Sequence, residues 1–151
     1  MSSNHHSPRH RAREIAFQFI YRYDQEIPGT QIFDEFTNHA AHFECPQESF
    51  DFAARLAETT LKQLKTIDEM IVKHAQNWRI DRINSVDKSI LRMGIAELLF
   101  FKDVPASVTL DELVELSKVF GEAETPSFVN GILDPISREP MATNGKVAST
   151  S

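Results

Sequence analysis

Cysteine and glycine are both scarce in this chain of 151 residues. Its single cysteine, Cys45, cannot form a disulfide within the chain, and we expect a small, partly buried apolar residue in a reducing compartment. With only five glycines the chain has few tight turns, which disfavours a hairpin-rich β fold. Because 41% of the residues are hydrophobic, the chain can bury a core without disulfides or a metal.

Long apolar runs and the common cofactor motifs are also missing. No run approaches the roughly 20 apolar residues of a membrane-spanning helix, so no membrane association is expected. The polar start, residues 1–8, lacks the apolar centre of a signal peptide, and the sequence therefore predicts a cytoplasmic protein. Neither the cysteine pairs and H-E-x-x-H pattern of metal sites nor the glycine-rich loops of nucleotide sites occur, so we expect no metal and no other cofactor.

The charge of the chain is unevenly distributed. The net charge is −6, yet residues 1–13 carry three arginines and no acidic residue. The remainder carries 13 basic and 22 acidic residues, which gives it a net charge of −9. One cationic end on an acidic body favours a local phosphate contact and a separate acidic face for a basic partner.

Hydrophobic periodicity predicts helices along the first half. One helix face is formed by Ala12, Ile15, Ala16, Phe19, Ile20 and Tyr23. Pro28-Gly29 ends this helix, and a second amphipathic segment runs from Ile32 to Phe43. Because no proline or glycine interrupts residues 48–75, we interpret them as one long helix, followed by a short element around Trp78.

The second half predicts three more helices. Ser85 is an expected N-cap of a helix from Val86 to about Lys102, which is apolar nearly all round and should be central. Residues 107–120 form an amphipathic helix, with Gly121 at the position of a C′ glycine. Thr125 and Pro126 read as N-cap and N1 of a last helix, which Pro135 should bend or shorten. The sequence therefore predicts an all-α fold of six or seven helices, with residues 1–8 and 139–151 disordered.

A cationic cluster opens the first helix. Arg9, His10, Arg11 and Arg13 suit a phosphate-binding site for RNA, because a guanidinium bonds two phosphate oxygens and stacks on bases. The alternative is a solvated cationic terminus, which is the commoner explanation of such a cluster. Positive charge at a helix N-terminus opposes the helix dipole and slightly lowers stability. This favours a role for the cluster other than stabilising the helix.

Aromatic and acidic side chains supply further candidates. Tyr21, with Phe17 one turn before it, is expected as an exposed aromatic pair for RNA stacking or as a protein anchor, or else as a peripheral core contact. Trp78 and the other phenylalanines are spaced as core residues. An acidic face for a basic partner, or a merely solvated helix face, is formed by Asp111, Glu112, Glu115, Glu122 and Glu124.

No constellation points to catalysis. His39 and His42 have metal-ligand spacing on a helix, but only Glu44 lies near, and solvated or packed histidines are expected. Cys45 beside them has no general base and no oxyanion hole assigned to it. The chain is therefore not expected to be an enzyme.

Three ordered motifs run through the sequence. The first is R-H-R-A-R-E at residues 9–14, continued by Ala16, Gln18 and Tyr21. The second is V-D-K-S-I-L-R at residues 86–92, leading to Glu97-Leu98. The third runs from Pro105 through Glu112, V-E-L at 114–116, Lys118 and F-G at 120–121 to F-V-N-G-I-L at 128–133. In this order and at this spacing they resemble the NusB transcription-antitermination family over residues 9–138.

The resemblance implies a fold and a function. It implies about seven helices in two tightly packed halves that form a single helical domain, residues 9–138. It implies binding of boxA-type RNA together with the ribosomal small-subunit protein NusE, within an antitermination complex on RNA polymerase that promotes rRNA transcription. By position in the motifs, the RNA-binding residues would be Arg9, His10, Arg11, Arg13, Gln18 and Phe128. The partner surface would include Tyr21, Asp87 and Glu124.

Several residues depart from the family pattern. His10 stands where arginine is common, which predicts a weaker or pH-sensitive RNA contact. Asp111 replaces the usual asparagine, and Pro126 with Ser127 replaces more polar, often basic residues, which removes a possible phosphate contact. Pro135 interrupts the last helix. These departures bear on affinity more than on family membership.

Other functions remain open at this point. The chain could be an RNA-processing or ribosome-assembly factor, or a protein-interaction homodimer that hides its RNA surface. Similar helical domains precede the catalytic domain of some rRNA cytosine methyltransferases, but 151 residues leave no room for a cofactor-binding sheet.

Overall fold

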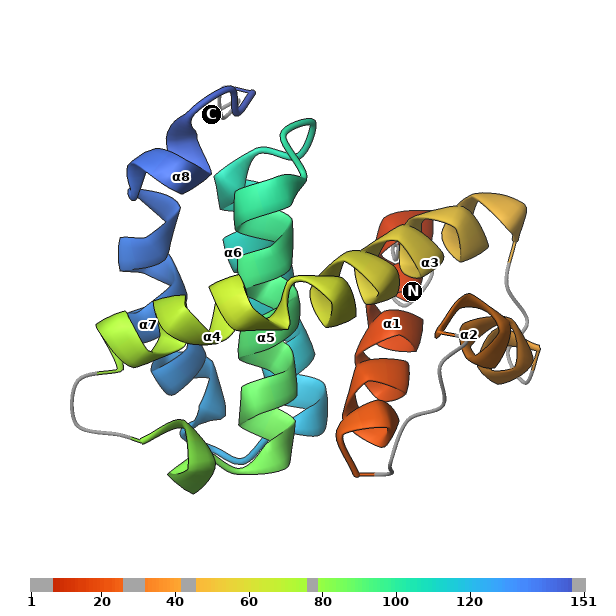
Figure 1. Cartoon of the computed structure of the whole chain (residues 1–151), viewed down its shortest axis with the longest axis horizontal. Helices are drawn as coiled ribbons and strands as arrows, with labels where there is room; N and C mark the ends of the chain where they lie inside the picture. Colours follow the sequence, from red (N-terminus) through yellow and green to blue (C-terminus); the bar gives the residue numbers. More distant parts are fainter. Residues whose placement is uncertain (1–6, 26–31, 42–45, 76–78, 148–151) are drawn as a thin grey trace. The chain divides into compact units, whose positions relative to one another are not determined.

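A computed structural model of the chain describes residues 7–25, 32–41, 46–75 and 79–147. Every regular element in these ranges is a helix, which confirms the all-α prediction (Figure 1). The elements are α1 Pro8–Gln25, α2 Ile32–Ala40, α3 Gln47–Lys62, α4 Leu64–His74, the short 3₁₀ helix η2 Ile80–Arg82, α5 Ser85–Phe100, α6 Ala106–Phe120, α7 Thr125–Ser137 and α8 Pro140–Thr143. None of these helices is both long and apolar enough to span a bilayer. The predictions for Pro28-Gly29, His42, Cys45 and Trp78 lie outside the described residues.

The helices divide into two compact units, Met1–Lys62 and Gln63–Ser151. In the first unit α1 packs along α3, and α2 packs against both. The predicted apolar face of α1 is buried except for Tyr23, which is part-exposed. Phe19 meets Phe36 of α2 edge-to-face with ring centroids 5.3 Å apart. His39 is buried with its Nε2 3.2 Å from the carbonyl oxygen of Ile15, so it is a packed histidine.

The predicted long helix over 48–75 is wrong, because it is divided at Gln63. α3 ends at Lys62 and α4 begins at Leu64. Gln63 between them is not helical, since its φ is −108° and its ψ is 22°. The two helices belong to different units, and each buries its own apolar residues there: Phe52 and Leu56 in α3, Ile67 and Ile71 in α4. The 3.6-residue pattern continues through Gln63, so periodicity alone could not reveal the division.

α5 is the central helix of the second unit, as predicted, and packs against α4, α6, α7 and α8. Eleven of its sixteen residues are buried, which explains its apolar character on all sides. A Cβ at Gly94 would lie 2.8 Å from Leu133 Cδ1 and 3.3 Å from Leu113 Cγ, so glycine lets α6 and α7 pack closely against α5.

The expected helix ends in this unit need three corrections. Asn84 rather than Ser85 is the N-cap of α5, and its Oδ1 accepts a 2.9 Å hydrogen bond from the Asp87 amide. Thr125 is already helical, so it is not the N-cap of α7; the helix ends at Ser137, two residues past Pro135. Gly121 does not use a left-handed C′ conformation, since its φ is −99°; a Cβ there would lie 2.5 Å from Thr125 Cβ.

The C-terminal segment after Glu139, expected to be disordered, packs on the second unit as far as residue 147. Lys146 Nζ donates to the carbonyl oxygens of Glu97, Leu98 and Phe101 at the end of α5. A cation here satisfies orphan carbonyls and favours the negative end of the helix dipole. Glu139 bonds Lys73 and His74 of α4, and these bonds lower the pKa of its carboxyl group.

Candidate nucleic-acid and partner interface

The first turns of α1 present a cationic surface that Glu14 partly neutralises. Arg9 is exposed, and His10 and Arg11 are part-exposed. Arg11 Nη1 lies 3.1 Å from Glu14 Oε1, and His10 Nε2 lies 3.6 Å from Glu14 Oε2. A phosphate approaching Arg11 therefore competes with a carboxylate of the same helix.

Arg11, Glu14, Gln18 and Tyr21 form one stripe along α1. Their spacing of three, four and three residues places them on a single helix face, and all four are part-exposed. The predicted RNA contact Gln18 and the predicted partner contact Tyr21 thus share a surface. Phe17 does not belong to it, because it is only 3% exposed. Of the two alternatives for this pair, the exposed aromatic pair is wrong and the core contact holds for Phe17, whose ring centroid lies 6.2 Å from that of Tyr21.

Arg13 was expected to be an exposed RNA contact, but it is buried. Its side chain is 3% exposed, and its guanidinium lies 5.2 Å from the centroid of the Phe52 ring. Arg9 stacks over the same ring at 4.5 Å. Position 13 falls on the buried side of α1, next to Ala12 and Ala16, so Arg13 supports packing rather than presenting a cation. Around Arg9 lies a hollow of about 250 Å³, whose other lining residues are Glu48, Asp51, Phe52 and Arg55.

A second hollow, in the second unit, brings together three predicted site residues. Asp87, Glu124 and Phe128 line a volume of about 180 Å³. Its wall is completed by Arg82, Ile83 and Asn84, which the sequence analysis did not select. Asn84 could have been found as an alternative N-cap beside Ser85, whereas Arg82 carries no signal in the sequence.

A buried hydrogen-bond chain holds the walls of this hollow together. Thr125 Oγ1 donates to Asp87 Oδ1 at 2.9 Å and accepts from the Glu122 amide at 2.9 Å. Thr125 is fully buried and Asp87 is 8% exposed. Asp87 therefore joins the start of α5 to the start of α7, which positions Glu124 and Phe128. Glu124 itself is exposed, and Phe128 is part-exposed.

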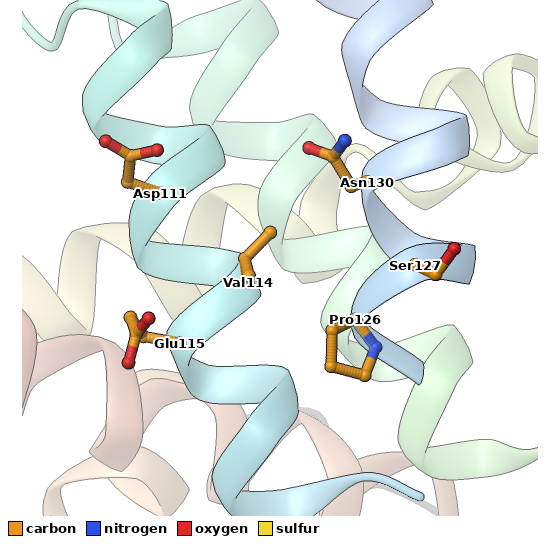
Figure 2. Close-up of a pocket in the computed structure, with 6 residues that line it drawn as sticks. All are labelled: Asp111, Val114, Glu115, Pro126, Ser127 and Asn130. Carbon is orange, nitrogen blue, oxygen red and sulfur yellow. The ribbon is translucent and has the colours of Figure 1, made fainter. Parts of the chain in front are cut away.

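A third concave surface lies between α6 and α7. This α6/α7 groove encloses about 560 Å³ and is lined by Asp111, Val114, Glu115, Pro126, Ser127 and Asn130 (Figure 2). Figure 2 shows Asp111 and Glu115 one turn apart on α6, with Asn130, Ser127 and Pro126 on α7. Among residues 7–25, 32–41, 46–75 and 79–147, no three histidine, cysteine or carboxylate side chains gather as a metal site.

Comparison with known proteins identifies the family. The model of the NusB family matches residues 10–138. The chain belongs to the NusB family. It is 40% identical over 125 residues to the transcription antitermination protein NusB of Syntrophus aciditrophicus (strain SB), covering 83% of this chain and 76% of that protein. It is 39% identical over 131 residues to the NusB protein of Exiguobacterium sp. (strain ATCC BAA-1283 / AT1b), covering 87% and 98%.

Solved structures of NusB proteins share the fold. T. maritima NusB superposes with a TM-score of 0.79 at 30% identity, covering 88% of this chain and 92% of that one. A structure of the antitermination factors NusB and NusE in complex with dsRNA matches with a TM-score of 0.76 at 28% identity, covering 87% and 96%. The resemblance drawn from the three sequence motifs is therefore confirmed.

Proposed function

We propose that this NusB-family protein is a non-enzymatic, cytoplasmic transcription antitermination factor that binds boxA-type single-stranded RNA together with NusE and promotes rRNA transcription. The observation that carries the proposal is the match to a NusB chain solved with NusE and dsRNA, over 87% of this chain. Relatives at 39–40% identity are transcription antitermination proteins, which supports the same role.

The RNA contact is proposed for the start of α1. Arg9, His10 and Arg11 supply cations, and Gln18 supplies amide hydrogen bonds on the Arg11 stripe. Since Arg13 is buried, two or three phosphate contacts are expected, which gives a salt slope of about −1.4 to −2.1 for a single strand. Such a slope means modest affinity for RNA alone, so a partner that adds surface and positive charge should tighten the complex.

The partner contacts are proposed for Tyr21 in the first unit and for Asp87 and Glu124 in the second. Glu124 offers an exposed carboxylate beside the hollow, and Phe128 offers a ring that can stack on a base. Asp87 acts mainly through Thr125, because its carboxylate is nearly buried and holds the loop that carries Glu124.

Fluorescence anisotropy of a labelled boxA-type strand tests the proposal, with and without NusE. We expect binding that NusE strengthens and that Arg9→Ala with Arg11→Ala weakens. The matched control is Arg79→Ala with Arg138→Ala, which removes two arginine side chains that are 76% and 66% exposed on the second unit. RNA binding that is equally tight without NusE would contradict the proposal that the partner tightens the complex. Absence of RNA binding in both conditions would overturn the RNA function.

A further inference from the structure

The net negative charge of the protein falls within residues 103–137, the segment that contains the α6/α7 groove. Residues 103–137 contain seven acidic residues and one basic residue, Lys118, whereas the rest of the chain contains 15 of each. These residues span α6, α7 and the connections beside them. A groove in this segment therefore has a negative potential that repels phosphate groups and attracts cations.

The exposed face of α6 combines that charge with apolar side chains. Val108, Asp111, Glu115 and Val119 are spaced by three, four and four residues, so they follow one stripe about 16 Å long. Val108 is 40% exposed and Val119 is 64% exposed, which is unusual for large apolar residues in the described part of the chain. Two carboxylates flanked by two exposed valines match a segment that carries both cations and apolar groups.

The lining of the groove carries negative charge and no basic side chain. Asp111 and Glu115 supply two carboxylates, and the other lining residues, Val114, Pro126, Ser127 and Asn130, are uncharged. Val114 and Pro126 supply apolar lining, and Asn130 and Ser127 supply neutral polar atoms (Figure 2). A lining with two carboxylates and no cation is more suitable for a basic group than for RNA, because it repels phosphate groups.

From these observations we propose that the α6/α7 groove is a docking site for a lysine- or arginine-bearing, partly apolar segment of a protein partner. Cationic side chains of the segment bond Asp111 and Glu115, and an apolar side chain lies against Val114 and Pro126. Glu115 already bonds Lys118 at 3.0 Å in the unbound chain, and both side chains are 59% exposed. The partner's cation therefore replaces Lys118 in a solvent-exposed ion pair, which costs little to break.

The test uses the full chain and a synthetic helical peptide as the probe. The peptide has about 14 residues, with two lysines four residues apart and a leucine one turn beyond each. ¹⁵N-labelled protein is titrated with it, and we expect amide shifts centred on Val114 and Asn130. A peptide with glutamine in place of lysine and one with serine in place of leucine should each bind at least severalfold more weakly.

Matched variants assign the binding to the groove. Asp111→Asn with Glu115→Gln should weaken the peptide about tenfold, the effect of two exposed ion pairs of good geometry. Glu69→Gln with Asp81→Asn removes the same charge from exposed positions elsewhere in the second unit and should change binding less than twofold. Ser127→Lys, an exposed substitution that places a cation in the groove, should abolish binding. Circular dichroism of each variant confirms that it is folded.

Several results would overturn the proposal. Equal weakening in both double variants would show a general charge effect, and shifts that spare Val114 and Asn130 would place the peptide elsewhere. RNA that shifts these amides and displaces the peptide would make the groove a nucleic-acid surface. Self-association of the protein that is lost in the Asp111 and Glu115 variant would assign the groove to a second copy. RNA affinity should be equal in the two double variants, so failure here is distinguishable from failure of the RNA function.

Discussion

Replacing Thr125 with valine should destabilise the second unit and loosen the hollow around Phe128. Valine has nearly the same shape, so the substitution removes the hydroxyl without creating a cavity. Two hydrogen bonds are lost, the one donated to Asp87 Oδ1 and the one accepted from the Glu122 amide. A hydrogen bond to a charged group contributes about 1.5–3 kcal/mol, and an unsatisfied buried group costs about 1–3 kcal/mol.

The two terms do not add in full. Glu122 is exposed, so its amide can bond water once the threonine is gone, whereas Asp87 is 8% exposed and recovers little hydration. We therefore expect a loss of about 2–3 kcal/mol in the free energy of unfolding. With a urea m-value of about 1–3 kcal/mol/M, the unfolding midpoint should fall by about 0.7–3 M.

Urea denaturation followed by circular dichroism at 222 nm measures this loss. Thr125→Ser is the control, because it keeps the hydroxyl and loses one methyl group, and it should cost only about 1 kcal/mol. Under the proposed function, Thr125→Val should also reduce the strengthening of RNA binding by NusE, since Glu124 adjoins position 125. The reasoning is refuted if Thr125→Val changes stability by less than about 0.5 kcal/mol, or if serine costs as much as valine.

Arg13→Ala should lower stability by about 1–3 kcal/mol because a buried, stacked side chain is lost, whereas Arg11→Ala should mainly weaken RNA binding. Thermal unfolding and RNA-binding anisotropy of both variants separate these effects. The reverse pattern would contradict the burial of Arg13. Lys146→Met should lower the free energy of unfolding by about 1–2 kcal/mol, because the terminal carbonyl groups of α5 lose their cation. Amide hydrogen exchange should become faster in the last turn of α5. Unchanged exchange would argue against a stabilising role of Lys146 at this helix end. The pKa of Glu139 is lowered in the folded state, so unfolded chains bind more protons than folded ones as the pH falls below the ordinary value of 4.5, and stability should fall there. The difference in the free energy of unfolding between the unmodified protein and Glu139→Gln should therefore shrink from pH 6 to pH 3. A constant difference would contradict the Glu139 contacts.

The sequence by itself determined the helical class, the central helix and the family. Apolar residues recur with helical spacing in α1, and most positions of α5 are apolar. Both patterns depend only on local geometry, which fixes the face of each side chain. The three motifs carried the family resemblance, since their order and spacing along the chain need no structure to be read. They also selected Asp87, Glu124 and Phe128, which the fold brings to one hollow.

Only the tertiary structure decided what covers each of these faces. Arg13 is buried because Phe52 of α3 lies against it. On the two sides of Gln63, α3 and α4 bury their apolar residues in different units. The C-terminal segment is held because Lys146 meets the end of α5. The α6/α7 groove likewise needs two helices to pack side by side before Asp111 and Pro126 become neighbours. A periodic pattern gives the direction of a side chain from its own helix, but the partner that it meets is set by contacts between residues far apart in sequence.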